Sequence, residues 1–352
     1  MKLDEKKVLK DLGLCARCRQ CRMVCEVPIA STMLPICPAG ECYKWDTYFA
    51  TGRITLAKKI LLGKIDFDES ILRSVYTCAQ CGSCLQQCPI LNFNPMEANL
   101  ILRQIAVEKG LADKVYVMPD TTPIQIGSAA DANNPTALFV GTVAQSDSAT
   151  VIKISDALRK AGVDHGFCTG LDAGEYLLRK GDIDAFEAKR DANVAAFEAA
   201  GIKRLIAHDP LTFYVLKTRY NLKEAGIDVV FYLSLLDGEV SGAAKAEKVT
   251  LHDNSYLGRA QGIYELPRKI LASLGYQVVE MIRTKENAFS CAAYPDCPKE
   301  MAENAASIIL GDAEQAGADL LVTVGRNDAA QLAATAARLN SPVKVCDISD
   351  LF

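Results

Sequence analysis

The chain has 352 residues and a formal net charge of −4, so neither its size nor its charge suggests a nucleic-acid-binding protein. Half of the residues are hydrophobic, which allows ordinary packed cores and, at this length, two or three domains. No apolar run approaches the roughly 18 residues of a membrane-spanning helix. The first ten residues are charged rather than apolar, so we expect no signal peptide. We expect a cytoplasmic location, or one at the inner face of the membrane through a partner.

Two cysteine runs are the most distinctive feature of a sequence that has 14 cysteines in all. Each run reads C-x2-C-x2-C-x3-C, and Pro89 follows the second run. This spacing is typical of bacterial ferredoxins, in which three cysteines of a run hold one [4Fe–4S] cluster and the fourth crosses to the other cluster. A zinc site is a weaker alternative, because zinc sites use paired C-x2-C or Cys/His sets.

The crossover rule therefore predicts two [4Fe–4S] clusters. The predicted ligands are Cys15, Cys18, Cys21 and Cys88 for the first cluster, and Cys78, Cys81, Cys84 and Cys25 for the second. One alternative stays open, since Cys25 is followed by Glu26 whereas Cys37 is followed by Pro38, so Cys37 could replace Cys25. The x3 spacing favours Cys25. Cys42 has no evident role, and we expect a small buried thiol there.

The sequence around the cysteine runs is helical in pattern. Residues 43–76, between the runs, carry apolar side chains at helical spacing, and Pro95 suits the first turn of a helix that reaches about Lys109. We therefore expect residues 1–112 to form an α-helical ferredoxin domain with two clusters. Residues 113–135 contain three prolines, a glycine and two asparagines, which predicts a linker.

The rest of the chain alternates short β-rich runs with Ala-rich helical stretches, a pattern typical of parallel sheets covered by helices. The predicted strands are 137–140, 204–207, 229–233, 249–252, 277–281 and 319–324, and the predicted helices are 148–161, a stretch from about 184, 262–274 and 300–316. The segment AGIKRLIA at Ala200 matches AGADLLVT at Ala316, which indicates an internal duplication. We expect two α/β lobes, 136–240 and 241–352, and an α+β multidomain protein overall.

Three arginines are interleaved with the first cysteine run, whereas the residues between the cysteines of the second run are neutral. They are Arg17, Arg19 and Arg22. Positive charge near a cluster favours its more negative, reduced state. This predicts the higher potential at the first cluster, unless the arginines are screened by solvent or dock an acidic partner.

Two of the three histidines stand in a His-Asp pair near a predicted strand end, where open α/β sheets bind ligands. His208-Asp209 and His252-Asp253 could form a ligand or acid/base site in a cleft between the lobes. Internal hydrogen bonding of such groups is the more common outcome, and it is the interpretation that we favour.

The remaining cysteines and loops give weaker signals. The four later cysteines could pair or bind a metal, although a lone intracellular cysteine is usually just buried. They are Cys168, Cys291, Cys297 and Cys346. No G-x-G-x-x-G or Walker motif is present, so we expect no hydride-transfer cofactor on this chain.

The cysteine runs and a further motif resemble one superfamily of iron–sulfur subunits. The segment HDNSYLGR at His252–Arg259 is similar to the family motif H-D-P-C-Y-L-G-R, and IYELPR at Ile263–Arg268 continues the match. Members include subunits of heterodisulfide reductase, of sulfite-reduction-associated membrane complexes, of anaerobic glycerol-3-phosphate dehydrogenase and of glycolate oxidase. The resemblance implies a helical domain with two [4Fe–4S] clusters, followed by two cysteine-rich "CCG" domains.

The sequence departs from this family in the CCG domains. Each domain normally supplies a lone cysteine, an adjacent pair and a C-P-x-C. Only Cys168 and Cys291 remain of the ten expected cysteines. The replacements are Gly141-Thr142, Thr169, Asp209-Pro210-Leu211-Thr212, Ser255, Ser290 and Gly325-Arg326-Asn327-Asp328. Because disulfide-reducing members are thought to hold noncubane clusters on these cysteines, the resemblance implies the fold and electron transfer rather than heterodisulfide reduction.

Together these features predict an electron-transfer subunit of a larger redox complex that is not itself catalytic. Single electrons would pass between a flavoprotein or ferredoxin and another subunit, such as a quinone- or cytochrome-type membrane protein, with the lobes as a docking platform. The alternative is a catalytic subunit that reduces a disulfide or another substrate between the lobes. Its residues would be Cys168, Cys291, His208, His252 and Asp209. A third interpretation is that the lobes hold a partner's cofactor.

Overall fold

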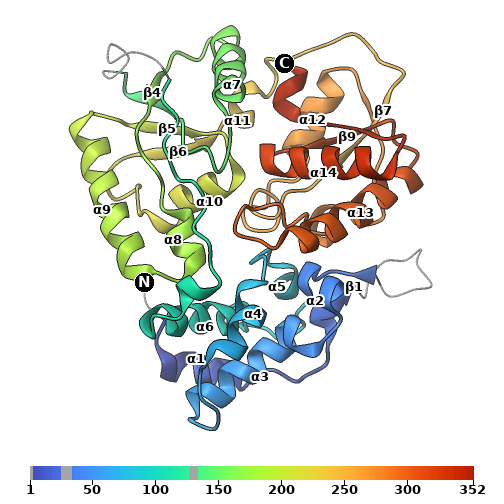
Figure 1. Ribbon diagram of the computed structural model, residues 1–352. Coiled ribbons are helices and arrows are strands. Elements are labelled where there is room, and N and C mark those ends of the chain that lie inside the picture. Colours follow the sequence, from blue (N-terminus) through green and yellow to red (C-terminus); the bar gives the residue numbers. More distant parts are fainter. Residues whose placement is uncertain (1–2, 25–33, 127–133) are drawn as a thin grey trace.

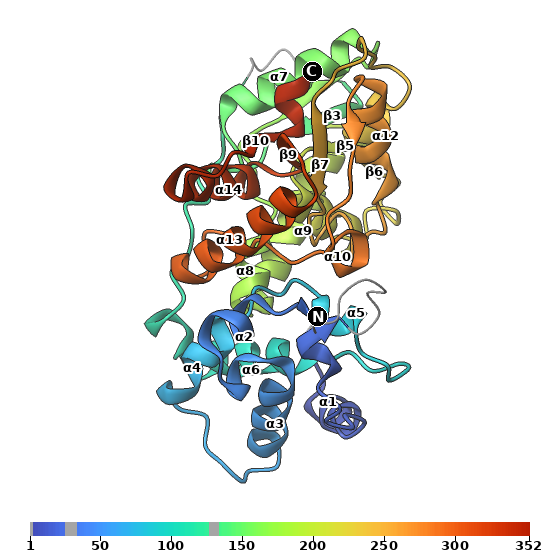
Figure 2. The same ribbon diagram turned by 90° about the vertical axis from the view of Figure 1, so that its right-hand side faces the viewer.

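The computed structural model describes residues 3–24, 34–126 and 134–352, which form a helical domain and two α/β lobes (Figure 1). Figure 1 draws the helical domain in blue at the bottom, the first lobe in green and yellow, and the second lobe in orange and red. Both views place the two lobes on the same side of the helical domain (Figure 2). The predicted combination of helices and parallel sheets is confirmed.

Helices and one short antiparallel strand pair form the described part of the helical domain. Its elements are α1 (Glu5–Leu12), β1 (Met23–Val24), β2 (Leu34–Pro35), α2 (Pro38–Tyr43), α3 (Ala50–Leu61), α4 (Glu69–Tyr76), α5 (Ser83–Gln86) and α6 (Glu97–Glu108). The predicted helical segment 43–76 is divided, because Gly63 adopts a left-handed conformation after α3 and Asp68 caps the start of α4. The apolar faces of α1, α3, α4 and α6 share one core, which includes Leu12, Ile54 and Leu102.

The first lobe is built on a four-stranded parallel sheet in the order β4-β3-β5-β6. Its elements are β3 (Thr136–Phe139), α7 (Ser148–Lys160), β4 (Gly166–Cys168), α8 (Glu175–Lys180), α9 (Ile183–Ala199), β5 (Arg204–Ala207), α10 (Pro210–Arg219), β6 (Asp228–Phe231) and α11 (Leu233–Leu236). The strands are short and apolar, as expected for a sheet that helices cover on both faces.

The second lobe repeats this topology. Its elements are β7 (Lys248–His252), α12 (Glu265–Ser273), β8 (Gln277–Val278), α13 (Lys299–Gln315), β9 (Leu320–Thr323), α14 (Arg326–Leu339) and β10 (Lys344–Asp347). Its sheet order is β10-β9-β7-β8, also fully parallel. In each lobe the first strand lies between the second and the third strand, and the two repeated sequence segments end in β5 and β9, the third strand of each sheet. In each sheet the fourth strand lies beside the third. The two lobes therefore have the same strand order, which agrees with the predicted duplication.

Several elements differ from the sequence prediction. The strands β4 and β10 and the helices α8, α10 and α14 were not predicted, and the predicted strand 277–281 is only two residues long. Consequently, Arg204–Ala207 is the third strand of its lobe and not the second. Within the described part of segment 113–135, Tyr116 packs in the core of the helical domain, whereas Ile124 packs on the first lobe. Ile124 is buried, and its backbone N–H donates to the carbonyl of Gly141 at 3.0 Å.

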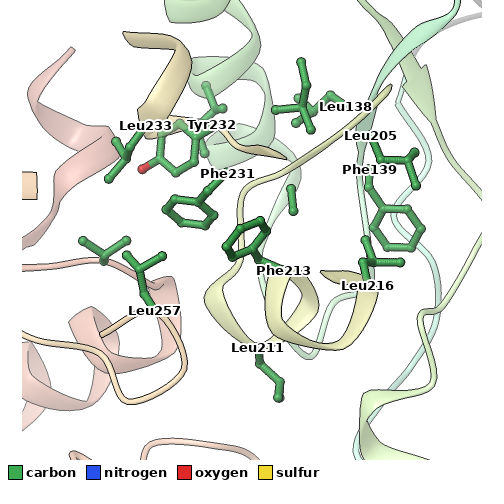
Figure 3. Packing of buried hydrophobic residues seen from close by; sticks show 14 of the residues in the cluster. Leu138, Phe139, Leu205, Leu211, Phe213, Leu216, Phe231, Tyr232, Leu233 and Leu257 are labelled. Atoms are coloured by element: carbon green, nitrogen blue, oxygen red, sulfur yellow. The ribbon is translucent and has the colours of Figure 1, made fainter. Parts of the chain in front are cut away.

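One hydrophobic core runs through both lobes. It joins residues of the first sheet, such as Leu138 and Phe231, to residues of the second lobe, such as Val249 and Leu257. Figure 3 shows Leu257 approaching the side of the first lobe that carries Leu211 and Phe231. The two lobes are therefore packed as one body above the helical domain.

Candidate functional site

The two cysteine runs share an unusual backbone conformation. In the first run Arg17 and Arg19, on either side of Cys18, have positive φ angles of 55° and 68°. In the second run Gln80 and Gly82, on either side of Cys81, have φ angles of 54° and 76°. Left-handed backbone is costly for any residue except glycine, and such conformations concentrate at functional sites. The two cysteine loops thus share one backbone geometry. Two loops that each wrap around the same kind of ligand are expected to share it.

A first cavity lies beside the first run. Four of the predicted ligands line it: Cys15, Cys18, Cys21 and Cys88. Cys88 comes from the second run, so the structure brings together the crossover set that the sequence predicts for the first cluster. Cys18 is exposed, whereas Cys21 is buried, and this cavity therefore reaches the molecular surface.

A second cavity lies beside the second run. The cysteines that line it are Cys37, Cys78, Cys81 and Cys84. Cys25, the predicted fourth ligand, lies outside the described residues. Pro95 borders both cavities, and the charge of Cys21 contributes to the raised pKa of Cys84, so the two sites are close neighbours.

The donor sets fit iron–sulfur clusters in number and chemistry. No three Cys, His, Asp or Glu side chains in the described part of the chain lie close enough together to bind one metal ion. A cubane cluster does not need its four cysteines to converge on one atom, because each cysteine binds a different iron atom. Burial raises the pKa of the Cys21, Cys84 and Cys88 thiols, so these groups would have to lose their protons for a cluster to bind.

Three arginines outside the second run donate hydrogen bonds to its backbone carbonyls. Arg103 of α6 binds the carbonyl of Cys78 at 2.7 Å, Arg179 of α8 binds that of Ala79 at 3.2 Å, and Arg259 of the second lobe binds that of Cys81 at 2.9 Å. The helical domain and both lobes thus each hold this loop. None of these arginines was assigned a role from the sequence, although Arg259 ends the HDNSYLGR motif.

Arg179 also fixes the lobes to one another. Its side chain is 2% exposed and forms an ion pair with the equally buried Asp296, at 2.8 Å. It donates in addition to the hydroxyl of Tyr256 at 2.7 Å and approaches the sulfur of Cys297 at 3.5 Å. A fully buried ion pair of this kind is costly to break, because a lone buried charge would remain.

Arg53 of α3 is a further residue that sequence reasoning missed. It lines the second cavity and is 2% exposed. It donates to the carbonyls of Ser74 and Tyr48, at 2.7 and 2.6 Å, and to the hydroxyl of Thr77 at 3.4 Å. All three acceptors are uncharged, so they do not neutralise the guanidinium of Arg53. Its positive charge therefore stabilises negative charge on a group bound at the second site.

The arginines of the first run are placed differently. Arg22 forms an ion pair with Asp46 and stacks over the ring of Phe49. Arg19 lies 3.9 Å from the same carboxylate and is 63% exposed. The paired carboxylate weakens the field of both arginines, and solvent weakens that of Arg19 further.

In the first lobe, hydrogen-bonded polar side chains occupy the region where the family resemblance predicts cysteines. The backbone N–H of Thr142 donates to Gln145, whose amide donates to Glu175, and the hydroxyl of Thr212 donates to the same Glu175 oxygen at 2.7 Å. Burial raises the pKa of Glu175 to about 8. Burial therefore favours the uncharged form of this carboxyl.

The second lobe carries a corresponding network. The side-chain amide of Asn254 donates to Asp328 at 2.9 Å, and Arg259 donates to the hydroxyl of Ser255 at 2.6 Å. Ser255 and Asp328 stand at two of the positions where cysteine was expected. Burial raises the pKa of Asp328 to about 7. Both lobes thus fill the family's cluster positions with protein hydrogen bonds.

The His-Asp pairs are used internally. In the first pair, a ring nitrogen of His208 lies 3.0 Å from the carbonyl of Val140, and Asp209 accepts from the backbone N–H of Thr212, capping α10. In the second pair, Arg268 binds both oxygens of Asp253 at 2.7 and 2.8 Å.

The second histidine, His252, lies 3.6 Å from Asp328, and burial lowers the pKa of this histidine to about 4. Cys168 and Cys291 are buried, and the described cysteines are all free thiols. His252, Cys168 and Cys291 are thus buried inside the lobes. In the described part of the chain, no helix is both long and apolar enough to cross a bilayer.

Comparison with known proteins gives three informative relatives, although no protein-family model matches the chain. The chain is 26% identical over 362 residues to a subunit of the dihydromethanophenazine:CoB–CoM heterodisulfide reductase of Methanosarcina acetivorans, covering 89% of this chain and 86% of that protein. It is 24% identical over 275 residues to the probable iron-sulfur-binding oxidoreductase FadF of Bacillus subtilis, covering 65% of this chain and 39% of that protein.

The third relative is the EtfAB:quinone oxidoreductase of Syntrophomonas wolfei, 31% identical over 144 residues, which cover 39% of this chain and 20% of the relative. The matches to this protein and to FadF span two fifths or less of the relatives' length. The fold also matches a crystal structure of a hypothetical protein from Helicobacter pylori, with a TM-score of 0.57 and 13% identity, over 99% of this chain and 76% of that one.

Proposed function

Because the chain belongs to the iron–sulfur superfamily that includes subunits of heterodisulfide reductase, we propose that it is an electron-transfer subunit of a multi-subunit redox complex. Two [4Fe–4S] clusters, when bound, would supply its single-electron carriers. Cys15, Cys18, Cys21 and Cys88 hold the first cluster. Cys78, Cys81, Cys84 and a fourth cysteine hold the second. Thiolate ligands of this kind are kept reduced in the cytoplasm, where we place the protein.

The observation that carries this proposal is the duplicated loop. Two separate cysteine runs adopt the same left-handed backbone on either side of their second cysteine, and each loop borders a cavity that four of the described cysteines line. A purely structural role would leave the strain at Arg17, Arg19 and Gln80 without a reason. Two adjacent sites suit an electron relay, because electrons must pass from one carrier to the next.

The chain's own residues give the two sites different surroundings. The first site opens to solvent at Cys18, so it is the one that an external redox partner can approach. The second site lies under the lobes, where Arg103, Arg179 and Arg259 bind its loop. We infer that electrons are exchanged with a diffusing or docked partner at the first site, and with the interior of the complex at the second.

The partners are inferred from the relatives. One relative is named as an EtfAB:quinone oxidoreductase, which supports an electron-transferring flavoprotein on one side and a quinone-linked subunit on the other. In this chain the lobes carry hydrogen-bonded side chains at the family's cluster positions, so they serve as a docking platform for such subunits. The electron's destination then lies on another polypeptide.

Iron content tests the proposal. The full chain, purified anaerobically, should contain about eight iron atoms and eight acid-labile sulfides per chain, since each cubane holds four of each. After reduction, electron paramagnetic resonance (EPR) should detect two interacting [4Fe–4S] clusters. About twelve or more iron atoms would require a further cluster in the lobes, and a chain without iron–sulfur clusters would contradict the proposal. Copurification of the native complex would identify the partners.

A second candidate function, reduction of a small substrate, is favoured by one cavity. This cavity, of about 100 Å³, lies between the helical domain and the first lobe, and Gln80, Glu175 and Arg179 are among the residues that line it. Gln80 also borders the second cysteine cavity. In the described structure the amide nitrogen of Gln80 and one oxygen of Glu175 are buried without a hydrogen-bond partner, so they could bind a polar ligand.

The two candidates differ in whether the isolated subunit can transfer electrons to a small molecule. Re-oxidation of the dithionite-reduced subunit by cystine, slowed in a Glu175→Gln variant, would support the catalytic candidate. A subunit that stays reduced with cystine but is re-oxidised by a flavoprotein partner would support the electron relay.

A further inference from the structure

We propose that Cys37, which belongs to neither cysteine run, is the fourth cysteine ligand of the second [4Fe–4S] cluster. This inference rests on the proposed electron-transfer function and completes its second site. It replaces Cys25, which the spacing within the first run favours.

The cavity itself is the first argument. Its lining includes Cys37 together with Cys78, Cys81 and Cys84, the three closely spaced cysteines of the second run. The first cavity already has its four cysteines without Cys37. Among the residues that the structure describes, four cysteines therefore line each cavity, which is the number that a cubane requires.

The chain path explains how a residue so far along the sequence reaches this cavity. β1 and β2 pair in antiparallel fashion, with Met23 opposite Pro35. The backbone N–H of Ile36 then donates to the carbonyl of Arg22 at 3.2 Å. This pairing returns the chain to the first run immediately before Cys37. The crossover of ferredoxins, in which the first run's region supplies a ligand to the second cluster, is thereby preserved.

Local structure fixes the direction of the thiol. Cys37 is the N-cap of α2, and its sulfur accepts a hydrogen bond from the backbone N–H of Gly40 at 3.4 Å. Gly40 cannot easily be replaced, since an added Cβ would clash with the ring of Phe49. The tight contact with Phe49 holds the start of α2, and with it the sulfur of Cys37, in place.

The surroundings of Cys37 also suit a ligand. Cys37 lines the cavity together with Arg53 of α3, whose side chain is 2% exposed. Arg53 then offsets part of the negative charge that four thiolates bring to the site.

The sequence contains a matching signal. Pro89 follows Cys88, the fourth ligand of the first site, and Pro38 follows Cys37 in the same way. Cys25 is followed by Glu26. A proline after the fourth cysteine is part of the bacterial ferredoxin pattern, so Cys37 matches that pattern where Cys25 does not.

Alanine variants of the two cysteines test this inference. Full-length wild type, Cys37→Ala and Cys25→Ala are purified anaerobically, and iron, acid-labile sulfide and the EPR spectrum of the reduced protein are measured. We expect Cys37→Ala to lose about half of the iron and the magnetic interaction between the two clusters, and Cys25→Ala to keep both. Cys42→Ala, a change at a nearby half-buried cysteine, is the matched control and should equal wild type.

The opposite pattern, with iron lost in Cys25→Ala and kept in Cys37→Ala, overturns the inference. If Cys37→Ala does not fold, the nearly isosteric Cys37→Ser variant decides the question. Its second cluster should be lost or should show a changed EPR signal, and a spectrum identical to wild type would count against Cys37. Failure of the proposed function is distinguishable, because wild type itself would then contain no [4Fe–4S] clusters.

Discussion

Arg53 and Arg103 bring buried positive charge to the second site. Both side chains are almost fully buried, and the hydrogen bonds of Arg53 and Arg103 go to uncharged carbonyl and hydroxyl oxygens. Buried charges are screened far less than exposed ones. The field at the second site is therefore stronger than the field of the partly neutralised arginines of the first run. We expect the second cluster to have the higher potential, the reverse of the order suggested by counting arginines in the sequence.

Replacing Arg53 by methionine should lower the midpoint potential of the second cluster. At an effective dielectric constant of about 20, one charge acting over roughly 10 Å contributes about 1–2 kcal/mol, or on the order of 50 mV for one electron. An EPR-monitored redox titration measures the shift. The exposed Arg19→Gln variant, beside the first site, is the control and should shift the potential of the first cluster much less. A larger shift in Arg19→Gln than in Arg53→Met would contradict this view of the two sites.

The cysteine loops are the elements whose conformation matters most. In the second loop Gly82 has a φ of 76°, and an added Cβ would meet only the sulfur of Met96, at 3.8 Å. The space is sufficient, so a substitution at Gly82 tests backbone conformation rather than packing. A left-handed conformation costs an L-residue about 1–2 kcal/mol.

We expect Gly82→Ala to reduce the iron content and to slow chemical reconstitution of the second cluster. Gly63→Ala is a matched control, because Gly63 also has a positive φ, with nothing within 4 Å of an added Cβ, and follows α3. Both variants should lose similar stability in thermal unfolding, but only Gly82→Ala should lose iron. Equal iron content in the two variants would show that the loop conformation is not required for cluster binding.

Local patterns predicted part of this structure well. The two cysteine runs, the helix after Pro95 and the β-rich strands in each lobe could be read from spacing and composition, because these signals are local. The strands β4 and β10, only three and four residues long, and the Ala-rich helix α14 were missed because short or weakly patterned segments carry little signal.

The candidate site was harder to predict from the sequence. The position of Cys37 depends on the pairing of β1 with β2, and the contact between Arg259 and the carbonyl of Cys81 joins residues 178 positions apart. Such contacts are set by tertiary packing and leave no periodic pattern. The proline after Cys37 was the one local signal, and the regular x3 spacing outweighed it.

The molecule as a whole keeps buried carboxyl groups in both lobes. Glu175 in the first lobe and Asp328 in the second have pKa values raised by burial, to about 8 and about 7. The ordinary values are 4.5 and 3.8. Between about pH 5 and 7 these two carboxyls therefore bind more protons in the folded state than in the unfolded state, and they lower the free energy of unfolding as pH rises. His252, whose pKa is lowered from 6.5 to about 4, opposes one of these two contributions below about pH 6.5.

Thermal stability should accordingly decrease from about pH 5.5 to pH 8. Each group contributes a slope of up to about 1.4 kcal/mol per pH unit, and Glu175→Gln removes one of the two contributions. Anaerobic thermal unfolding of wild type and Glu175→Gln across this range measures the difference. Glu303→Gln, on the surface of α13, should leave the slope unchanged. An unaltered slope in Glu175→Gln would mean that this carboxyl is already ionised in the folded protein.

The unequal exposure of the two cavities has a consequence for the behaviour of the protein in air. Cys18 is exposed at the first cavity, whereas the four described cysteines of the second cavity are only partly exposed. Ala39 of α2 and Met301 of α13 pack together beside the second cavity. Oxygen and peroxide therefore reach the first site sooner. A cluster held at the first site should therefore be damaged by oxidants before one held at the second, and this loss would end electron exchange with outside partners while the inner carrier is still intact.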